Sequence, residues 1–202
     1  MQKNLQGGFI IKKQLYEVPY NKQIRVIIDT DADAEADDQF AIVHALLTPK
    51  FDVLGIVAEH FGEHDYTDSM ERSYAEIKKL LELMDIDDIP VFKGETKALA
   101  DEKTAGESEG AKFIIQEALK EDYRPLVVLN MGAITNLASA YLLNPEIGSK
   151  LSAVWIGGGS YSKPMLDFNV GNDVAAANVI LESDIELWQI PTSAYTMMEV
   201  SF

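Results

Sequence analysis

The densest group of chemically capable side chains in this sequence is an acidic run at residues 29–38. Mutual repulsion among its carboxylates destabilises a folded chain unless a cation or hydrogen-bond donors lie among them. With no cysteine and three histidines in the chain, oxygen ligands would dominate such a site, which favours Ca²⁺ or Mg²⁺ over zinc. The alternative to a metal site is a solvated acidic loop whose carboxylates cap the amino-terminal end of the helix that follows. The six carboxylates are those of Asp29, Asp31, Asp33, Glu35, Asp37 and Asp38.

An alternation of strand-like and helix-like segments positions this run. Residues 24–28, just before it, form a short β-branched apolar run typical of a strand covered on both faces. Similar runs predict five further strands, at residues 53–57, 89–92, 126–129, 153–156 and 185–190. Apolar residues at helical spacing predict helices at residues 40–47, 69–84, 111–119, 136–143 and 174–181. We therefore expect an α/β fold with a mainly parallel open sheet of about six strands, helices on both faces and a Rossmann-like core.

Sheets of this kind bind ligands beyond the carboxyl ends of their strands. We expect the acidic run to meet two other strand-end segments there, residues 130–132 and 167–169. His60 and His64 flank the loop after the second strand, where either could contact a ligand or lie in solvent. The two tryptophans fall within predicted strands and are expected in the core: Trp155 and Trp188.

The composition excludes several classes of protein. The 202 residues carry 17 Lys and Arg against 33 Asp and Glu, a formal net charge of −16, which repels phosphate backbones and anionic lipid headgroups. We therefore expect no nucleic-acid partner and no membrane partner. No apolar stretch is long enough for a signal-peptide core or a membrane span, and the lack of cysteine fits a cytoplasmic protein. We expect residues 1–22 to be a peripheral lead-in and residues 23–202 to form one α/β domain.

Four motifs occur in a characteristic order along the chain. The first joins VIIDTD at residues 26–31 to DDQFAI at residues 37–42. The others are IPVFKG at residues 89–94, GAITNLA at residues 132–138, and GGG at residues 157–159 leading to DFN at 167–169 and DVAA at 173–176. Together they resemble the motifs of the calcium-dependent, inosine-uridine preferring nucleoside hydrolase family, whose amino-terminal signature is DTDPGxDDxxAI. The similarity covers residues 24–200.

This resemblance implies a reaction and a set of roles. The reaction is hydrolysis of the N-glycosidic bond of a small ribonucleoside to free base and ribose. Asp31 would bind Ca²⁺ and act as the general base toward the attacking water, and Asp38 would be a bidentate calcium ligand. The main-chain carbonyl of Met131 would also bind Ca²⁺. The side chains implied to bind the sugar hydroxyls are Asp37, Asp167 and Asn169.

The acidic run departs from the family signature. Two extra residues separate Asp31 from the Asp37 and Asp38 pair, and the usual Pro-Gly is absent. Either the loop bulges and the pair keeps its place, or Asp33 or Glu35 joins the site. The Gly-Asn that usually follows the second strand is replaced by HFGEH at residues 60–64, which leaves the preferred nucleoside open.

The carboxyl end also departs from the family. Family members continue beyond the position of Phe202 with a further calcium-binding Asp and often a His that protonates the leaving base. We therefore expect the domain to be incomplete at its carboxyl end. Apolar surface left exposed there should promote self-association, so we expect a homo-oligomer.

Two other functions fit part of the pattern. A non-catalytic calcium-binding or sugar-binding relative would keep the acidic run and lose the chemistry. A magnesium-dependent phosphatase similar to the haloacid dehalogenases would use Asp29 as its nucleophile, with Asp31 two residues later. Such enzymes also need Ser or Thr at the end of the second strand, where this chain has Val57, Ala58 and Glu59, and a Lys before a later acidic pair, which the sequence does not show.

Overall fold

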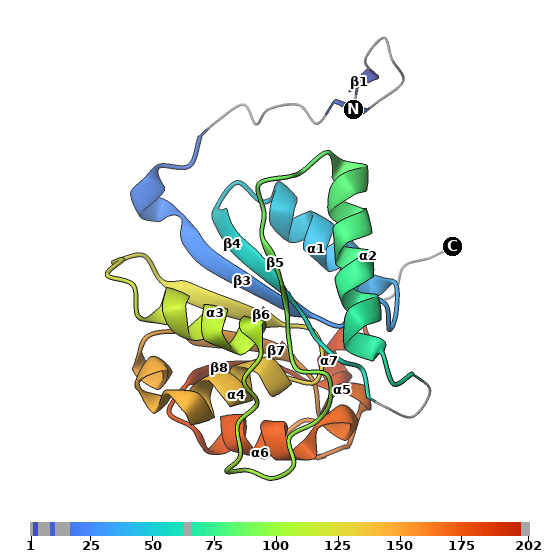
Figure 1. Ribbon diagram of the computed structural model, residues 1–202, viewed down its shortest axis with the longest axis vertical. Helices are drawn as coiled ribbons and strands as arrows, with labels where there is room; N and C mark the ends of the chain where they lie inside the picture. The colour runs from blue at the N-terminus through green and yellow to red at the C-terminus, as the bar shows by residue number, and fades with distance from the viewer. Residues whose placement is uncertain (1, 4–8, 11–16, 63–65, 199–202) are drawn as a thin grey trace.

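Within the residues that the structure describes, six parallel strands form the central sheet in the order β5-β4-β3-β6-β7-β8 (Figure 1). Every neighbouring pair in this order is parallel, which confirms the expected α/β fold. The computed structural model describes residues 2–3, 9–10, 17–62 and 66–198. The strands are β3 (Ile24–Thr30), β4 (Phe51–Ala58), β5 (Val91–Lys93), β6 (Leu126–Asn130), β7 (Ser152–Ile156) and β8 (Glu186–Ile190).

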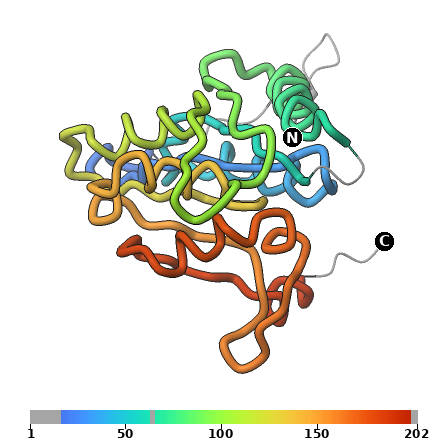
Figure 2. Tube along the Cα trace, turned by 60° about the horizontal axis from the view of Figure 1, so that its bottom comes forward, coloured from blue at the N-terminus to red at the C-terminus, as the bar shows by residue number. Residues whose placement is uncertain are grey.

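Helices cover both faces of the sheet, as expected (Figure 1, Figure 2). Along β3, Val26 and Ile28 pack on the side of the first two helices, whereas Ile27 packs in the core on the opposite side. Because both sides of this strand are buried, its sequence is a nearly continuous apolar run. The helices on the first side are α1 (Asp37–Leu47) and α2 (Ser69–Met84), and those on the second are α3 (Glu109–Ala118), α4 (Thr135–Leu143) and α6 (Val174–Glu182).

Several short elements were not predicted from the sequence patterns. They are β1 (Gln2–Lys3), β2 (Phe9–Ile10), α5 (Phe168–Asn172), α7 (Thr192–Tyr195) and the 3₁₀ turns η1 (Tyr20–Lys22) and η2 (Pro145–Ser149). Strands β1 and β2 pair antiparallel with each other. Most of the expected lead-in at residues 1–22 lies outside the described residues. Across the part of the chain that is described, no helix is long and apolar enough to cross a membrane.

The strand order reverses between β3 and β6. From β3 the chain proceeds outward to β4 and β5, and it then returns to the other side of β3 to form β6, β7 and β8. In open parallel sheets a ligand crevice forms outside the carboxyl ends of the strands at such a reversal. The acidic run follows β3 directly, so the topology places it at this crevice.

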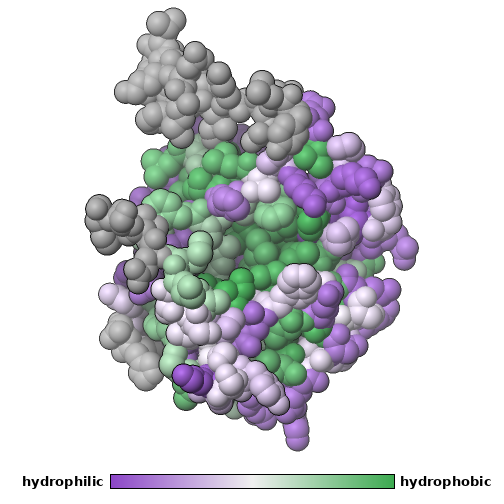
Figure 3. Space-filling view, turned by 180° about the vertical axis from the view of Figure 1, so that it is seen from behind, coloured by the Kyte–Doolittle hydropathy of each residue, from purple (hydrophilic) through white to green (hydrophobic). Residues whose placement is uncertain are grey.

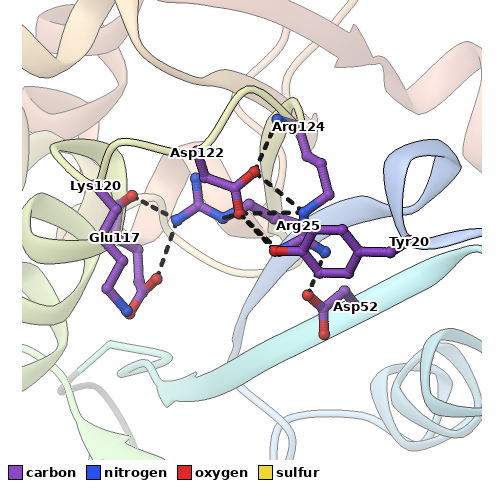
Figure 4. Close-up of polar contacts among 7 residues, drawn as sticks. All are labelled: Tyr20, Arg25, Asp52, Glu117, Lys120, Asp122 and Arg124. Carbon is purple, nitrogen blue, oxygen red and sulfur yellow. Dashed lines mark hydrogen bonds and ion pairs between the residues drawn. The ribbon is translucent and has the colours of Figure 1, made fainter.

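The opposite, amino-terminal edge of the sheet is held by an ion-pair network (Figure 4). Arg25, with an exposed fraction of 3%, donates from Nη2 to the carbonyl and Oε2 of Glu117 at 2.7 and 3.1 Å. Arg124 donates to Asp122 at 2.7 Å and to Asp52 at 2.6 Å. These contacts join the beginnings of β3, β4 and β6 to the end of α3, so they fix the strand that carries the acidic run.

One side of β7 and β8 carries no helix among the described residues. We call it the open face and define it by Val154, Ile156, Trp188 and Ile190, which pair across the two strands and lie opposite the α4 and α6 side. Trp188 is 64% exposed, so its predicted core position is wrong, whereas Trp155 is fully buried as predicted. The error arises because β8 is an edge strand covered on one face. Viewed from behind, the molecule shows hydrophobic side chains across its middle (Figure 3).

Candidate functional site

The end of β3 places two carboxylates inside the protein. Asp29 is fully buried, and Asp31 has an exposed fraction of 2%. Asp29 Oδ1 accepts a hydrogen bond from Asn136 Nδ2 at 2.9 Å, whereas Asp29 Oδ2 has no hydrogen-bond partner among the described residues. Burial raises the pKa of Asp29 to about 7. An ionised carboxylate is therefore costly here unless a cation lies beside it.

Asp38 lies in the first turn of α1 and is buried against the same strand end. Its Oδ1 accepts a hydrogen bond from Thr30 Oγ1. Burial raises the pKa of Asp38 to about 7. Burial also raises the pKa of Asp31 well above its usual value, and the charge of Asp38 is the next largest cause. The two extra residues in the loop therefore do not separate Asp31 from Asp38.

The segments after β6 and β7 reach the same place. A Cβ atom at position 132 would lie 3.0 Å from Asp31 Oδ1, so Gly132 lets the backbone pass close to that carboxylate. Asn169 Nδ2 donates to the carbonyl oxygens of Met131 at 2.8 Å and Ile156 at 2.7 Å. The three segments expected to meet at the carboxyl edge do so in the structure.

The three side chains predicted to bind sugar are placed differently from one another. Asp37 is exposed at the beginning of α1. Asp167 caps α5 by accepting a hydrogen bond from Val170 N at 3.0 Å, and its second oxygen accepts one from Tyr195 Oη at 2.9 Å. Asn169 uses its amide nitrogen on two carbonyls, so its Oδ1 is the atom left for a hydroxyl donor. Sequence reasoning missed the contact from Tyr195.

Two further acids of the run point elsewhere or remain at the surface. Asp33 forms an ion pair with Arg72, whose Nε lies 2.7 Å from Asp33 Oδ2. Arg72 also lies 4.0 Å from the ring centroid of Tyr66. Glu35 is exposed. Asp33 is therefore engaged with α2, and the buried part of the site consists of other carboxylates.

Glu59 is a buried site residue that the sequence analysis did not select. It follows β4 directly and is fully buried. Its Oε1 accepts hydrogen bonds from the backbone N–H groups of Thr135, at 2.6 Å, and Asn136, at 3.4 Å, while Oε2 has no partner among the described residues. Burial raises the pKa of Glu59, and the charges of Asp29 and Asp31 raise it further. The sequence signal that could have identified Glu59 as a site residue was its position directly after a predicted strand.

His60 is buried and belongs to a series of hydrogen bonds between polar groups, so it does not lie in solvent. Its Nδ1 accepts a hydrogen bond from Gly62 N at 3.2 Å, which assigns the proton to Nε2, 2.8 Å from Thr135 Oγ1. Thr135 Oγ1 in turn donates to Asp173 Oδ2 at 2.8 Å. Burial lowers the pKa of His60 to about 4. His60 therefore ties β4 to α4 and α6 as a neutral ring. His64 lies outside the described residues.

The donor set at this edge fits a hard cation by its chemistry. No three His, Asp or Glu side chains within the described ranges already gather into a ready metal cage. Two fully buried carboxylates nevertheless keep an oxygen without a hydrogen-bond partner, Asp29 and Glu59, and Asn130 Oδ1 is also buried and unpartnered. Calcium binds such oxygens, and an uncompensated buried carboxylate is otherwise destabilising. Asp31 lies beside Glu59 at Gly132, and the charge of Asp38 acts on Asp31, so both carboxylates could complete a cation site. The Met131 carbonyl accepts a hydrogen bond from Asn169 at the same edge.

The six-stranded parallel sheet with helices on both faces is a nucleoside hydrolase-like fold, and its carboxylate-rich edge lies at the strand reversal. The sequence model described as inosine-uridine preferring nucleoside hydrolase matches residues 26–201. The chain therefore belongs to the inosine-uridine preferring nucleoside hydrolase family. Family membership argues against the alternative function of a phosphatase similar to the haloacid dehalogenases.

Individual relatives agree with the family assignment. The pyrimidine-specific ribonucleoside hydrolase RihA of Escherichia coli O1:K1 is 27% identical over 180 residues, which cover 77% of this chain and 56% of that protein. A solved inosine-guanosine nucleoside hydrolase is 26% identical, with a TM-score of 0.64 over 83% of this chain and 59% of that one. The purine-preferring ribonucleoside hydrolase from Gardnerella vaginalis has a TM-score of 0.66 at 21% identity, covers 83% of this chain and 60% of its own, and shows the fold alone. The chain thus spans 56% of the length of the curated relative.

Proposed function

We propose that this chain carries the water-activating and sugar-binding part of a calcium-dependent ribonucleoside hydrolase. The observation that supports it most strongly is the meeting of Asp31 and Asp38 with the Met131–Gly132 backbone at the strand reversal. Family membership supplies the reaction class, cleavage of an N-glycosidic bond by water. The products would be free base and ribose.

Asp31 is the proposed general base. Water forms a bond from its oxygen to the anomeric carbon, and Asp31 takes the proton that this water releases. The bond from that carbon to the base nitrogen breaks, and the base leaves with the electron pair of that bond and takes up a proton from solvent. Asp31 is nearly enclosed by protein, so the proton moves within a site of low dielectric constant. When bound, Ca²⁺ would make the water more acidic and hold two ribose hydroxyls. Its proposed ligands are Asp31, Asp38 and the carbonyl of Met131.

The remaining carboxylates have an electrostatic role in this proposal. Cleavage of the bond develops positive charge on the ribose ring, and carboxylates placed around it stabilise that charge. Asp37 is accessible to a ribose hydroxyl at the surface of the site. Asn169 offers Oδ1, and Asp167 would have to share an oxygen already bonded to Tyr195 or Val170. We therefore rank Asp167 below the other two as a direct sugar ligand.

The test is release of ribose from ribonucleosides by the purified chain with added calcium. We expect turnover on at least one of uridine, cytidine and inosine, and Asp31→Asn should lower kcat by several orders of magnitude while the circular dichroism spectrum stays unchanged. Asp33→Asn is the matched control, because Asp33 is paired with Arg72 instead of lining the buried site. Wild-type turnover that survives Asp31→Asn would refute the assignment of the base.

A non-catalytic role is the second candidate, and one observation favours it. The chain spans 56% of the length of the curated relative, so residues that complete catalysis in that relative could lie in the part not matched. A calcium-binding or ribose-binding protein would retain the carboxylates and show no turnover. Ribose binding by calorimetry, measured beside the turnover assay, distinguishes the two functions. A cytoplasmic location and a homo-oligomeric state remain predictions from the sequence.

A further inference from the structure

Glu59 has a geometry that neither the family motifs nor a structural role explains fully. A buried glutamate that only tied β4 to α4 would need one oxygen, and Oε1 already accepts the N–H groups of Thr135 and Asn136. These bonds at the beginning of α4 fix the carboxylate in orientation. The second oxygen is held in the protein interior without a donor. Leaving a buried carboxylate oxygen without a partner costs free energy, so we expect a bound group that is not part of the polypeptide to interact with it.

The free oxygen points toward the proposed catalytic carboxylate. A Cβ atom at position 132 would lie 3.0 Å from Glu59 Oε2 and 3.0 Å from Asp31 Oδ1. The two oxygens therefore flank the same small volume beside Gly132 and are no more than twice that distance apart. Both belong to carboxylates with exposed fractions of at most 2%. Gly132 keeps the volume between them open.

The neighbours of this volume favour a cation as the missing partner. The neighbouring charges that raise the pKa of Glu59 are those of Asp29 and Asp31, which are negative. Asp29 also presents an unpartnered oxygen from the adjacent strand. Two acidic groups cannot donate hydrogen bonds to each other while both are ionised, whereas a divalent cation satisfies several carboxylate oxygens at once.

We propose that Glu59 Oε2 is a further ligand of the divalent cation held by Asp31 and Asp38. This inference rests on the proposed function for the identity of the cation, and it adds a ligand that directly follows β4 to those that follow β3, lie in α1 and follow β6. Glu59 thereby couples the cation to the beginning of α4, because its other oxygen holds the Thr135 and Asn136 backbone.

The test measures calcium affinity directly. Calcium is titrated by calorimetry, and Tb³⁺ is then displaced by calcium in a Trp188→Phe background, where Trp155 is the sensitiser. The Trp155 indole donates to the carbonyl of Gly132 at 2.9 Å, so it lies beside the site. Glu59→Gln keeps an oxygen for the α4 backbone and replaces the free oxygen with an amide nitrogen. We expect it to weaken calcium binding about tenfold or more.

Glu117→Gln is the matched control. Glu117 is also a buried glutamate, but it pairs with Arg25 and Lys120 at the opposite edge of the sheet. Its variant should bind calcium as the wild type does. Equal affinities of Glu59→Gln and wild type would overturn the inference.

A second variant keeps the inference testable if Glu59→Gln does not fold. Gly132→Ala removes no carboxylate, but its methyl group occupies the volume between Asp31 and Glu59. We expect weaker calcium binding from this variant as well. Wild-type affinity in Gly132→Ala would contradict the proposal.

Failure of this inference differs from failure of the hydrolase proposal. If wild type binds calcium, Glu59→Gln does not, and no nucleoside is cleaved, then the ligand assignment stands and the hydrolase function fails. If nucleosides are cleaved with calcium and Glu59→Gln retains full affinity, then the function stands and the ligand assignment fails. If wild type binds no calcium, the ligand assignment is overturned.

Discussion

Replacing Arg25 with Met should destabilise the fold strongly although Arg25 lies far from the site. Arg25 is 3% exposed and donates to the carbonyl and the carboxylate of Glu117, and its Nε lies 3.7 Å from Asp122. Removing one partner of a buried ion pair costs about 3 to 5 kcal/mol, because the other charge stays buried. Lys120 still pairs with Glu117 at 2.5 Å, so we expect a loss of about 3 kcal/mol, at the lower end of that range.

Urea unfolding followed by circular dichroism measures this loss as a change in midpoint at constant slope. Arg25→Met combined with Glu117→Leu should recover about 2 kcal/mol, since the double variant no longer buries a carboxylate that has lost its Arg25 partner. The matched surface control is Lys93→Met, which breaks an exposed pair with Glu71 and should cost less than about 1 kcal/mol. A loss below about 1 kcal/mol in the single Arg25 variant, or no recovery in the double variant, would refute the reasoning.

Three further predictions concern the metal, pH and association. Calcium should raise the melting temperature more than magnesium does, because flexible carboxylates suit irregular coordination, and Asp38→Ala should abolish the rise; an unchanged calcium shift in that variant contradicts its role. Hydrogen bonds from Arg124 hold the pKa of Asp122 well below its usual range, so the stability that Asp122 adds is present above the usual Asp pKa and lost as pH falls through the lower folded value. Urea midpoints of wild type and Asp122→Asn should therefore converge in acid, and a constant difference would refute this. Trp188→Lys should reduce self-association through the open face, and sedimentation velocity identical to that of wild type would contradict it.

The sheet could be predicted from the sequence because its strands carry strong local signals. Residues 24–28 are apolar at every position but Arg25. This run is nearly continuous because α1 and α2 cover one face of β3 and α3 and α4 cover the other. The position of the acidic run followed from the parallel topology. The bounds of α2 were predicted correctly because its apolar stripe is regular, and in the structure the helix ends just before Asp85, which is in the left-handed conformation.

Other features depend on contacts that no local pattern encodes. Trp188 looks like a core residue by type, and its exposure follows from the edge position of β8. In the sequence Glu59 is an ordinary acidic residue after a strand. Its role depends on two backbone donors of α4, which lie more than 70 positions away in the sequence. His60 lies in the loop after β4 as predicted, but its burial could not be predicted because its hydrogen-bond partner Thr135 is 75 positions away in the sequence.

The strand reversal between β3 and β6 also has a consequence for how the protein folds. The site lies on the seam between two halves of the sheet, and the Asp29–Asn136 hydrogen bond across that seam joins residues 107 positions apart. Contacts of such long sequence separation form late, because the chain must first lose the entropy of closing a long loop. The half that contains β3, β4 and β5 can gather its carboxylates before β6 arrives, but Gly132 and Met131 are then still missing. Cation binding therefore reports completion of the sheet, and its onset in a refolding experiment should coincide with the slowest recovery of native structure rather than with early helix formation.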